Sequence, residues 1–285
     1  MMRTLFIFLF TAGLLQAQSP NRNKKETNND KPIILGISRE LRSEILSEKR
    51  TLNIYLPEGY NAKDTSRYPV VYLLDGRTDE DFIHVVGLYQ FNSFPWIDRV
   101  PRSIIVGIVN VDRKRDFTFP TTVTADQKQF PTAGHSEKFM DFIEKELQPY
   151  IDKTYKTSSS KTLIGESLGG LFASEVILKR PALFNRYIII SPSIWWDNGS
   201  LLKFEPGSKY PSVPTDIYIG VGKEGLAPGE NPHVMEVDAN LLAEKLKNLW
   251  SKKLSVHFDY LPQETHSTIS HQAIFNALRE LYPAK

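Results

Sequence analysis

A serine between two glycines lies near the middle of the sequence, in a context that suits a nucleophile. The stretch GESLGG places Ser167 after the short apolar run 162–164 and before a segment with helical spacing. On a tight strand-to-helix turn, a serine hydroxyl is lifted above the end of a sheet, and Gly165 and Gly169 leave room for that turn. The alternative is a glycine-rich turn that only lets helix and strand pack closely. The position within an alternating pattern favours the nucleophile.

A serine hydroxyl needs a base to take its proton, and four histidines follow Ser167 in the chain. His266 comes after the last predicted strand and just before the last predicted helix, in a loop that should open onto the carboxyl edge of the sheet. We therefore expect His266 to be the base. His257 lies inside a predicted strand and His271 inside a predicted helix. His233, in a loop rich in proline and glycine, is the second choice.

The acid that orients the imidazole is expected between the serine and the histidine in chain order. Glu224 follows the predicted strand 215–222 directly, so we assign the acid to it. Glu230, Asp238 and Asp197 are alternatives, because they also lie in or near loops after predicted strands. A Ser–His pair without a strong acid is a further possibility.

Two backbone amides are expected to bind the oxyanion of an ester that Ser167 attacks. One is the amide of Leu168, which opens the helix after the serine and therefore has no helical partner. The other is the amide of Arg77, the residue after the strand-like run 68–76; it acts through its backbone and not through its charge. An ordinary turn capped by Asp75 is compatible with the same residues.

Apolar runs alternate with helical patterns over most of the chain, which predicts an α/β fold. Short runs bounded by proline or glycine predict strands at 68–76, 103–111, 161–165, 185–191, 215–222 and 254–262, and helical spacing predicts helices at 136–151, 168–180, 237–250 and 268–281. Continuous apolar runs are typical of strands buried on both faces. We predict a central, mostly parallel sheet with helices on both faces, in a single domain over 33–285.

The N-terminus has the pattern of a secretory signal peptide. Arg3 precedes an apolar stretch at 5–15, and small and polar residues follow up to Ala17. A membrane-spanning helix would need about 20 apolar residues, so an anchor is the weaker interpretation. We expect a signal peptide over 1–17, a flexible polar leader over 18–32, a periplasmic or secreted mature chain, and no stable membrane insertion after cleavage.

The composition excludes several classes of function. The 285 residues include no cysteine, which rules out disulfides, thiolate catalysis and zinc sites made of cysteines. Basic and acidic residues number 35 and 33, a net charge of +2, so there is no basic footprint for nucleic acid. The sequence does not indicate an oligomeric state.

Four stretches of the sequence resemble a known family. YPVVYLLDG, GESLGGLFASEVIL, SPSIWWDN and ETHSTISHQAIFNAL are similar to the esterase D-type esterases of the α/β-hydrolase fold, over roughly Leu35 to Tyr282. That family includes siderophore trilactone esterases, feruloyl esterases and S-formylglutathione hydrolases. The resemblance implies a serine hydrolase without metal or cofactor, with Ser167 as nucleophile, His266 as base, and the amides of Leu168 and Arg77 at the oxyanion.

Glu166 departs from the pattern of this family, in which many members have a histidine before the serine. A carboxylate so near the nucleophile either raises the pKa of the base by favouring the imidazolium or points aside and is inert. We expect a modest role at most.

The stretch SPSIWWDN resembles the siderophore-esterase branch of the family. We expect Trp196 or Trp195 to line the pocket and stack on an aromatic acyl group; the alternative is that they pack the core. Arg113, with Arg115, would attract an anionic substrate, or else both arginines form ion pairs with the neighbouring aspartates in a solvated loop.

The function predicted from these features is a secreted or periplasmic serine carboxylesterase acting on a small-molecule ester, with ferric-siderophore lactones as candidate substrates. Alternatives are a feruloyl or acetyl esterase on polysaccharides, an acyltransferase with the same catalytic residues, and a non-catalytic binding protein. Export argues against a cytosolic thioesterase acting on glutathione esters.

Overall fold

A computed structural model describes residues 30–207, 211, 213–228, 232–249 and 253–283. The chain divides into two units, Met1–Ile34 and Leu35–Lys285, and the fold below is that of the second. The predicted signal peptide (1–17), most of the predicted leader (18–32) and Glu230 lie outside the described residues.

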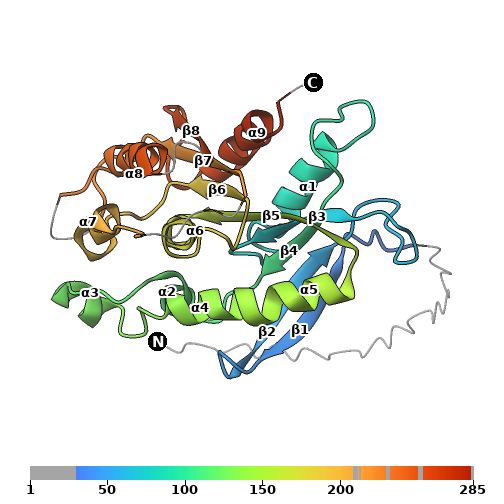
Figure 1. Cartoon of the computed structure of the whole chain (residues 1–285), viewed down its shortest axis with the longest axis horizontal. Helices are drawn as coiled ribbons and strands as arrows, with labels where there is room; N and C mark the ends of the chain where they lie inside the picture. The colour runs from blue at the N-terminus through green and yellow to red at the C-terminus, as the bar shows by residue number, and fades with distance from the viewer. Residues whose placement is uncertain (1–29, 208–210, 212, 229–231, 250–252, 284–285) are drawn as a thin grey trace, which may run out of the picture. The chain divides into compact units, whose positions relative to one another are not determined.

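An eight-stranded sheet forms the centre of the described unit, in the order β1-β2-β4-β3-β5-β6-β7-β8 (Figure 1). The strands are β1 (Ile37–Ser43), β2 (Glu48–Tyr55), β3 (Tyr68–Leu73), β4 (Ile104–Ile108), β5 (Thr157–Glu166), β6 (Arg186–Ile190), β7 (Thr215–Gly222) and β8 (Leu254–Leu261). β3 to β8 are parallel, while β2 pairs antiparallel with β1 and β4. The mostly parallel sheet predicted from the apolar runs is confirmed.

Helices cover both faces of the sheet, as predicted. They are α1 (Phe82–Asn92), α2 (Arg113–Phe117), α3 (Thr124–Gln129), α4 (Ser136–Phe142), α5 (Gln148–Thr154), α6 (Leu168–Lys179), α7 (Trp196–Lys203), α8 (Met235–Leu249) and α9 (Ile269–Leu281). Val70 and Tyr72 of β3 are buried in a cluster with α6 and α8, whereas the alternate Val71 is buried with α1 and α9. Because both faces are buried, the central strands are apolar throughout.

The predicted helix 136–151 is interrupted in the structure. α4 is followed by a π-helical turn, η1 (Ile143–Leu147), and then by α5. The Gln148 amide donates to the Ile143 carbonyl, five residues back. Pro149 follows and has no amide to donate, which favours a widened turn at this point over a regular α-helix.

The loops that matter for chemistry all leave the same edge of the sheet. In a parallel sheet the carboxyl ends of neighbouring strands meet at one edge, where ligands bind in open α/β folds. Ser167 follows β5 at the centre of the sheet, Glu224 follows β7, and His266 lies in the loop between β8 and α9. Three distant parts of the sequence are thereby brought to one place.

Candidate active site

Ser167 occupies a strained turn between β5 and α6. Its backbone angles are φ 59° and ψ −117°, a region that residues other than glycine rarely adopt and that costs on the order of 1–3 kcal/mol. The turn is held by the Ser167 amide, which donates to the Ile190 carbonyl at 3.0 Å. A Cβ at Gly165 would lie 2.4 Å from the Gly169 carbonyl oxygen, so the turn requires glycine there.

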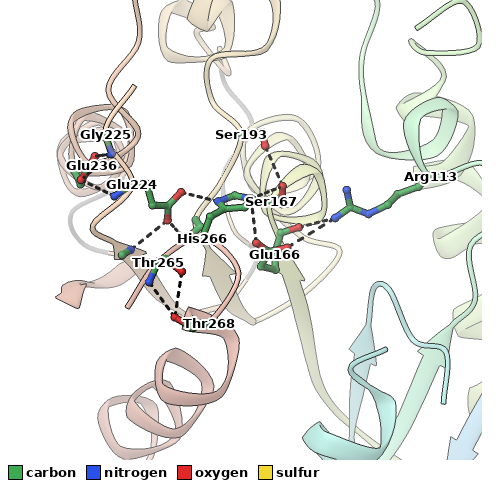
Figure 2. A network of polar contacts seen from close by, with 12 residues as sticks. Arg113, Glu166, Ser167, Ser193, Glu224, Gly225, Glu236, Thr265, His266 and Thr268 are labelled. Atoms are coloured by element: carbon green, nitrogen blue, oxygen red, sulfur yellow. Dashed lines mark hydrogen bonds and ion pairs between the residues drawn. The ribbon is translucent and has the colours of Figure 1, made fainter. Parts of the chain in front are cut away.

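The structure brings Ser167, His266 and Glu224 into one chain of hydrogen bonds (Figure 2). The Ser167 Oγ lies 2.9 Å from His266 Nε2, and His266 Nδ1 lies 2.6 Å from Glu224 Oε2. Because a carboxylate only accepts, Nδ1 carries the proton of the neutral imidazole. Nε2 is then free to accept the serine proton, which is the arrangement of a serine–histidine–acid triad.

The alternative bases and acids in the described part of the chain lie in other contacts. His233 Nδ1 pairs with Asp238 Oδ2 at 2.8 Å. His271 Nδ1 lies 2.6 Å from His84 Nε2. The remaining carboxylate, Asp197, accepts hydrogen bonds from Thr121 and Thr122. These side chains therefore have partners away from Ser167.

Glu224 is held as a carboxylate by its surroundings. Its side chain is only 3% exposed, and it accepts hydrogen bonds from the Ser191 hydroxyl and from the Gly222 amide. Burial raises the pKa of this carboxyl, but the hydrogen bonds from His266 and Ser191 outweigh burial and lower the pKa overall. Ser191 was not predicted from the sequence; it follows β6 directly with a φ of 41°, and its place in SPS after a strand is the only signal.

The pKa of His266 is raised, chiefly by its hydrogen bond to Glu224. Burial lowers this pKa, while the charges of Glu166 and Glu224 raise it further. The charged form of the His266 ring is therefore stabilised by acidic groups on both of its sides.

Glu166 does not point aside. Its Oε1 lies 3.3 Å from His266 Nε2, and its side chain is 20% exposed. Burial raises the pKa of Glu166 to about 7, against the lowering effect of His266 and Arg113. Figure 2 shows Glu166 beside Ser167 on one side of the imidazole and Glu224 on the other.

Arg113 is committed to a different partner from those expected. Its Nε and Nη2 donate to the two oxygens of Asp75 at 2.6 and 2.9 Å, and Nη2 also donates to the Glu166 carbonyl at 3.1 Å. Asp75 therefore compensates the charge that Arg113 was expected to offer to a substrate, and the described walls of the pocket at Ser167 do not include Arg113. Arg115 forms ion pairs with Glu48 and Asp116. The pair with Asp116 was predicted as the alternative to substrate binding, and the pair with Glu48 was not.

Trp196 is not a pocket residue. Its side chain is buried in the core at 1% exposure, and its indole Nε1 donates to the Phe119 carbonyl at 2.8 Å. Trp196 therefore packs the core, which is the alternative that the sequence left open, and it does not line the pocket at Ser167. Trp195 is half-buried and lines the pocket beside Ser167.

A pocket of about 470 Å³ opens at Ser167. Besides Ser167 and His266, its walls include Trp195, Lys223, Leu226 and Met235. It falls in the size range of small-molecule sites, about 300–1,000 Å³, with a mainly apolar wall and a few polar groups. Lys223 brings a positive charge to this wall, and no sequence pattern singles it out.

The two amides predicted for the oxyanion lie in suitable elements. Leu168 is the first residue of α6, and Arg77 follows β3 in a loop that passes next to the serine turn. A Cβ at Gly169 would lie 3.4 Å from Asp75 Oδ2 and 3.5 Å from the Leu74 side chain, which places that loop against the turn. The Arg77 side chain forms an ion pair with Asp79 at 2.8 Å. The group of Arg77 that is a candidate to donate to an oxyanion is therefore its backbone amide.

The described residues offer neither a metal site nor a membrane-spanning helix. They contain no cluster of three or more histidine, aspartate or glutamate side chains arranged to hold a metal ion. None of their helices is both long and apolar enough to cross a membrane.

Comparison with known proteins decides the family. The family described as "Putative esterase" matches residues 43–275. The chain belongs to this family. It is 30% identical over 254 residues to the ferri-bacillibactin esterase BesA of Bacillus subtilis (strain 168), covering 82% of this chain and 85% of that one.

Solved structures of related proteins agree with this assignment. An IroE-like serine hydrolase from Shewanella oneidensis superposes with a TM-score of 0.76 at 36% identity, covering 87% of this chain and 80% of the other. The BES protein from Bacillus cereus gives 0.75 at 28% identity, covering 90% and 99%. The chain therefore has the α/β-hydrolase fold and is a serine hydrolase that acts on carboxylic esters, as the sequence resemblance implied.

Proposed function

We propose that Ser167, His266 and Glu224 are the catalytic triad with which this esterase cleaves its substrate. The observation that supports this proposal most directly is the chain of hydrogen bonds at 2.9 and 2.6 Å from the serine hydroxyl through the imidazole to a buried carboxylate. The strained turn at Ser167 and the pocket that opens beside it are further support.

In this mechanism the Ser167 Oγ attacks the ester carbonyl carbon while its proton moves to His266 Nε2. The carbonyl π electrons become an oxyanion, which the amides of Leu168 and Arg77 stabilise. The tetrahedral adduct then expels the alcohol, which takes the proton from Nε2. Water repeats the sequence on the acyl-enzyme, giving its proton to Nε2 and releasing the acid and the free serine.

The substrate class we propose is the ester or lactone bond of a siderophore. The ferri-bacillibactin esterase of Bacillus subtilis is a relative whose name points to this class. Two pocket residues suit it: Trp195 offers an aromatic face to an aromatic acyl group, and Lys223 offers a positive charge to an anionic chelate. We also propose that the enzyme works outside the cytoplasm, on the evidence of the N-terminal signal-peptide pattern.

A hydrolysis panel tests the reaction and the substrate class together. Purified protein from residue 18 onward is assayed on ferric and apo catecholate trilactones, methyl ferulate and a short-chain nitrophenyl ester. Ser167→Ala is compared with Ser158→Ala, a serine-to-alanine change on β5 but remote from the pocket residues. We expect trilactones to give the highest kcat/KM, and Ser167→Ala alone to remove activity on every substrate.

Other outcomes would overturn one part or the other. Activity retained by Ser167→Ala contradicts the triad. A preference for methyl ferulate contradicts the siderophore class and favours esters of plant polysaccharides. If a competing alcohol yields more ester than free acid, the enzyme is an acyltransferase and not a hydrolase.

A further inference from the structure

The imidazole of His266 lies between two carboxylates, and only one of them belongs to the triad. Glu224 contacts Nδ1 at 2.6 Å, whereas Glu166 Oε1 lies 3.3 Å from Nε2. Nε2 is also the atom that accepts the proton of Ser167, at 2.9 Å from its Oγ. The nitrogen that must take up and give back the proton therefore has a carboxylate and the nucleophile as neighbours at once.

Neighbouring residues hold Glu166 in position. Its carbonyl accepts a hydrogen bond from Arg113 Nη2 at 3.1 Å, and the same nitrogen lies 4.0 Å from its carboxylate. Two hydrogen bonds hold Arg113 on Asp75, which also accepts from Asn110 at 2.6 Å. The Arg113 charge beside Glu166 is thus already compensated by another carboxylate.

The charged groups around Glu166 come from several elements. Arg113 of α2 and His266 of the β8–α9 loop favour its charged form. Asp75 after β3 and Asp81 before α1 oppose it, as does its burial beside the serine turn. Burial is the largest of these effects, and with Asp75 and Asp81 it outweighs His266 and Arg113, so the pKa of Glu166 is raised to about 7.

We propose that Glu166 is a positioning residue that shares one proton with His266 Nε2, and that it thereby sets both the lowest pH of ester hydrolysis and the preference among leaving groups. This inference rests on the proposed triad, because it assigns Glu166 a role toward the base of that triad.

The effect on pH follows from counting protons. Nε2 can accept from Ser167 only when it holds no proton of its own. One bound proton can lie on Nε2, in an ion pair with Glu166, or on Glu166, which then donates to Nε2. Both forms occupy the lone pair that Ser167 needs, so activity requires the pair to lose this shared proton. A proton held by two groups leaves at higher pH than one held by the imidazole alone.

The effect on leaving groups follows from the second half of acylation. When the bond between the carbonyl carbon and the leaving oxygen breaks, an alkoxide must take the proton of Nε2, whereas a nitrophenolate leaves without one. An imidazolium stabilised by Glu166 is a weaker acid and assists the alkoxide less. The wild-type enzyme should therefore favour aryl esters over alkyl esters more strongly than a variant without this carboxylate.

The experiment compares Glu166→Gln with Glu80→Gln. The first keeps the size of the side chain and removes its charge. The second removes the carboxylate of Glu80, an exposed residue in the loop after β3. The charges of Arg77 and Asp75 act on this carboxylate, but no contact between it and His266 is among those of the described structure. For both variants, kcat/KM is measured from pH 5 to 10 on a nitrophenyl acetate and on a series of alkyl and aryl acetates.

For Glu166→Gln we expect the acid limb of kcat/KM to move to lower pH by about one unit. At pH 9, above that limb in both proteins, the ratio of alkyl to aryl kcat/KM should rise about threefold, the change for one pKa unit at a Brønsted coefficient of about 0.5. Glu80→Gln should move the acid limb by much less and leave the ratio unchanged.

Two results would overturn the inference while leaving the triad in place. In one, Glu166→Gln has the wild-type pH profile and leaving-group ratio. In the other, folded Glu166→Gln is inactive at every pH, which would make Glu166 indispensable and not a modulator of the base. A separate result would contradict the triad itself: ester hydrolysis that is retained in Ser167→Ala.

Discussion

Two carboxylates flank His266, and their surroundings give them different character. Glu224 is 3% exposed but receives hydrogen bonds from Ser191, the Gly222 amide and His266, which keep its pKa below the ordinary value. At Glu166, by contrast, burial is the largest effect and raises the pKa to about 7. One carboxylate therefore remains ionised and orients the ring, while the other changes its charge in the neutral range.

The free energy of unfolding should depend on pH through the protonation of Glu166. Its pKa is about 7 in the folded state and 4.5 as the reference value, so the folded state binds this proton more tightly. The resulting stabilisation is complete below pH 4.5 and is lost as the pH rises through 7. As the pH rises from 5 to 9, the free energy of unfolding should fall by about 2 kcal/mol more in the wild type than in Glu166→Gln. Urea unfolding at each pH measures both values. Equal losses in the two proteins would contradict the raised pKa.

The two adjacent tryptophans should respond differently to substitution. Trp196→Phe removes buried volume and the hydrogen bond to the Phe119 carbonyl, and should lower the free energy of unfolding by about 1–3 kcal/mol. Trp195→Ala should instead raise KM for an aromatic ester more than for an acetate, because Trp195 lines the pocket. Thermal melts and KM on both esters, measured on both variants, separate the roles; an equal KM effect on both esters would contradict stacking.

At the scale of elements, the β5–α6 turn leaves no room for a side chain at Gly165. Gly165→Ala would place a methyl group 2.4 Å from the Gly169 carbonyl oxygen, so the strand and helix must move apart and Ser167 with them. We expect a loss of more than about 2 kcal/mol in stability and a fall in kcat. Gly87→Ala in α1 is the matched control, since nothing lies within 4 Å of its Cβ position. It should stabilise the protein by about 0.5–1 kcal/mol; a similar result for Gly165→Ala would contradict the described turn.

The elements differed in how well their sequences predicted them. The strands at the centre were predicted because burial on both faces leaves them continuously apolar, as in Arg186–Ile190. Helix α1 (Phe82–Asn92) was missed, since it is apolar around most of its circumference and shows no clear stripe. Helix α7 was missed because Asp197, Asn198 and Gly199 take left-handed angles within it.

At the scale of the whole molecule, the parallel sheet explains why the meeting of Ser167, Glu224 and His266 could be predicted while the surroundings of these residues could not. The residues Ser167, Glu224 and His266 each follow a strand, and parallel strands end at one edge, so chain order and element type were sufficient. The ion pair of Arg113 with Asp75 and the burial of Trp196 depend on loop conformation and on partners 38 and 77 residues away. No local pattern encodes such contacts.

Export is a proposal about the whole chain that a direct measurement can test. If residues 1–17 are a cleaved signal peptide, the chain expressed in a Gram-negative host should appear outside the cytoplasm and begin at Gln18. Cell fractionation followed by N-terminal sequencing checks both points. A full-length chain confined to the cytoplasm would contradict the proposal, and Phe8→Arg, which interrupts the apolar stretch, serves as the control that should block export.

The most direct test of the proposed triad is covalent trapping of the nucleophile. A fluorophosphonate is added to the folded protein at pH 8, and the modified residue is identified by peptide mass mapping. We predict one adduct, formed on the Ser167 Oγ with loss of fluoride, and labelling slowed at least about 1,000-fold in His266→Ala. Labelling at a different residue, or no labelling of a preparation that hydrolyses esters, would contradict the triad.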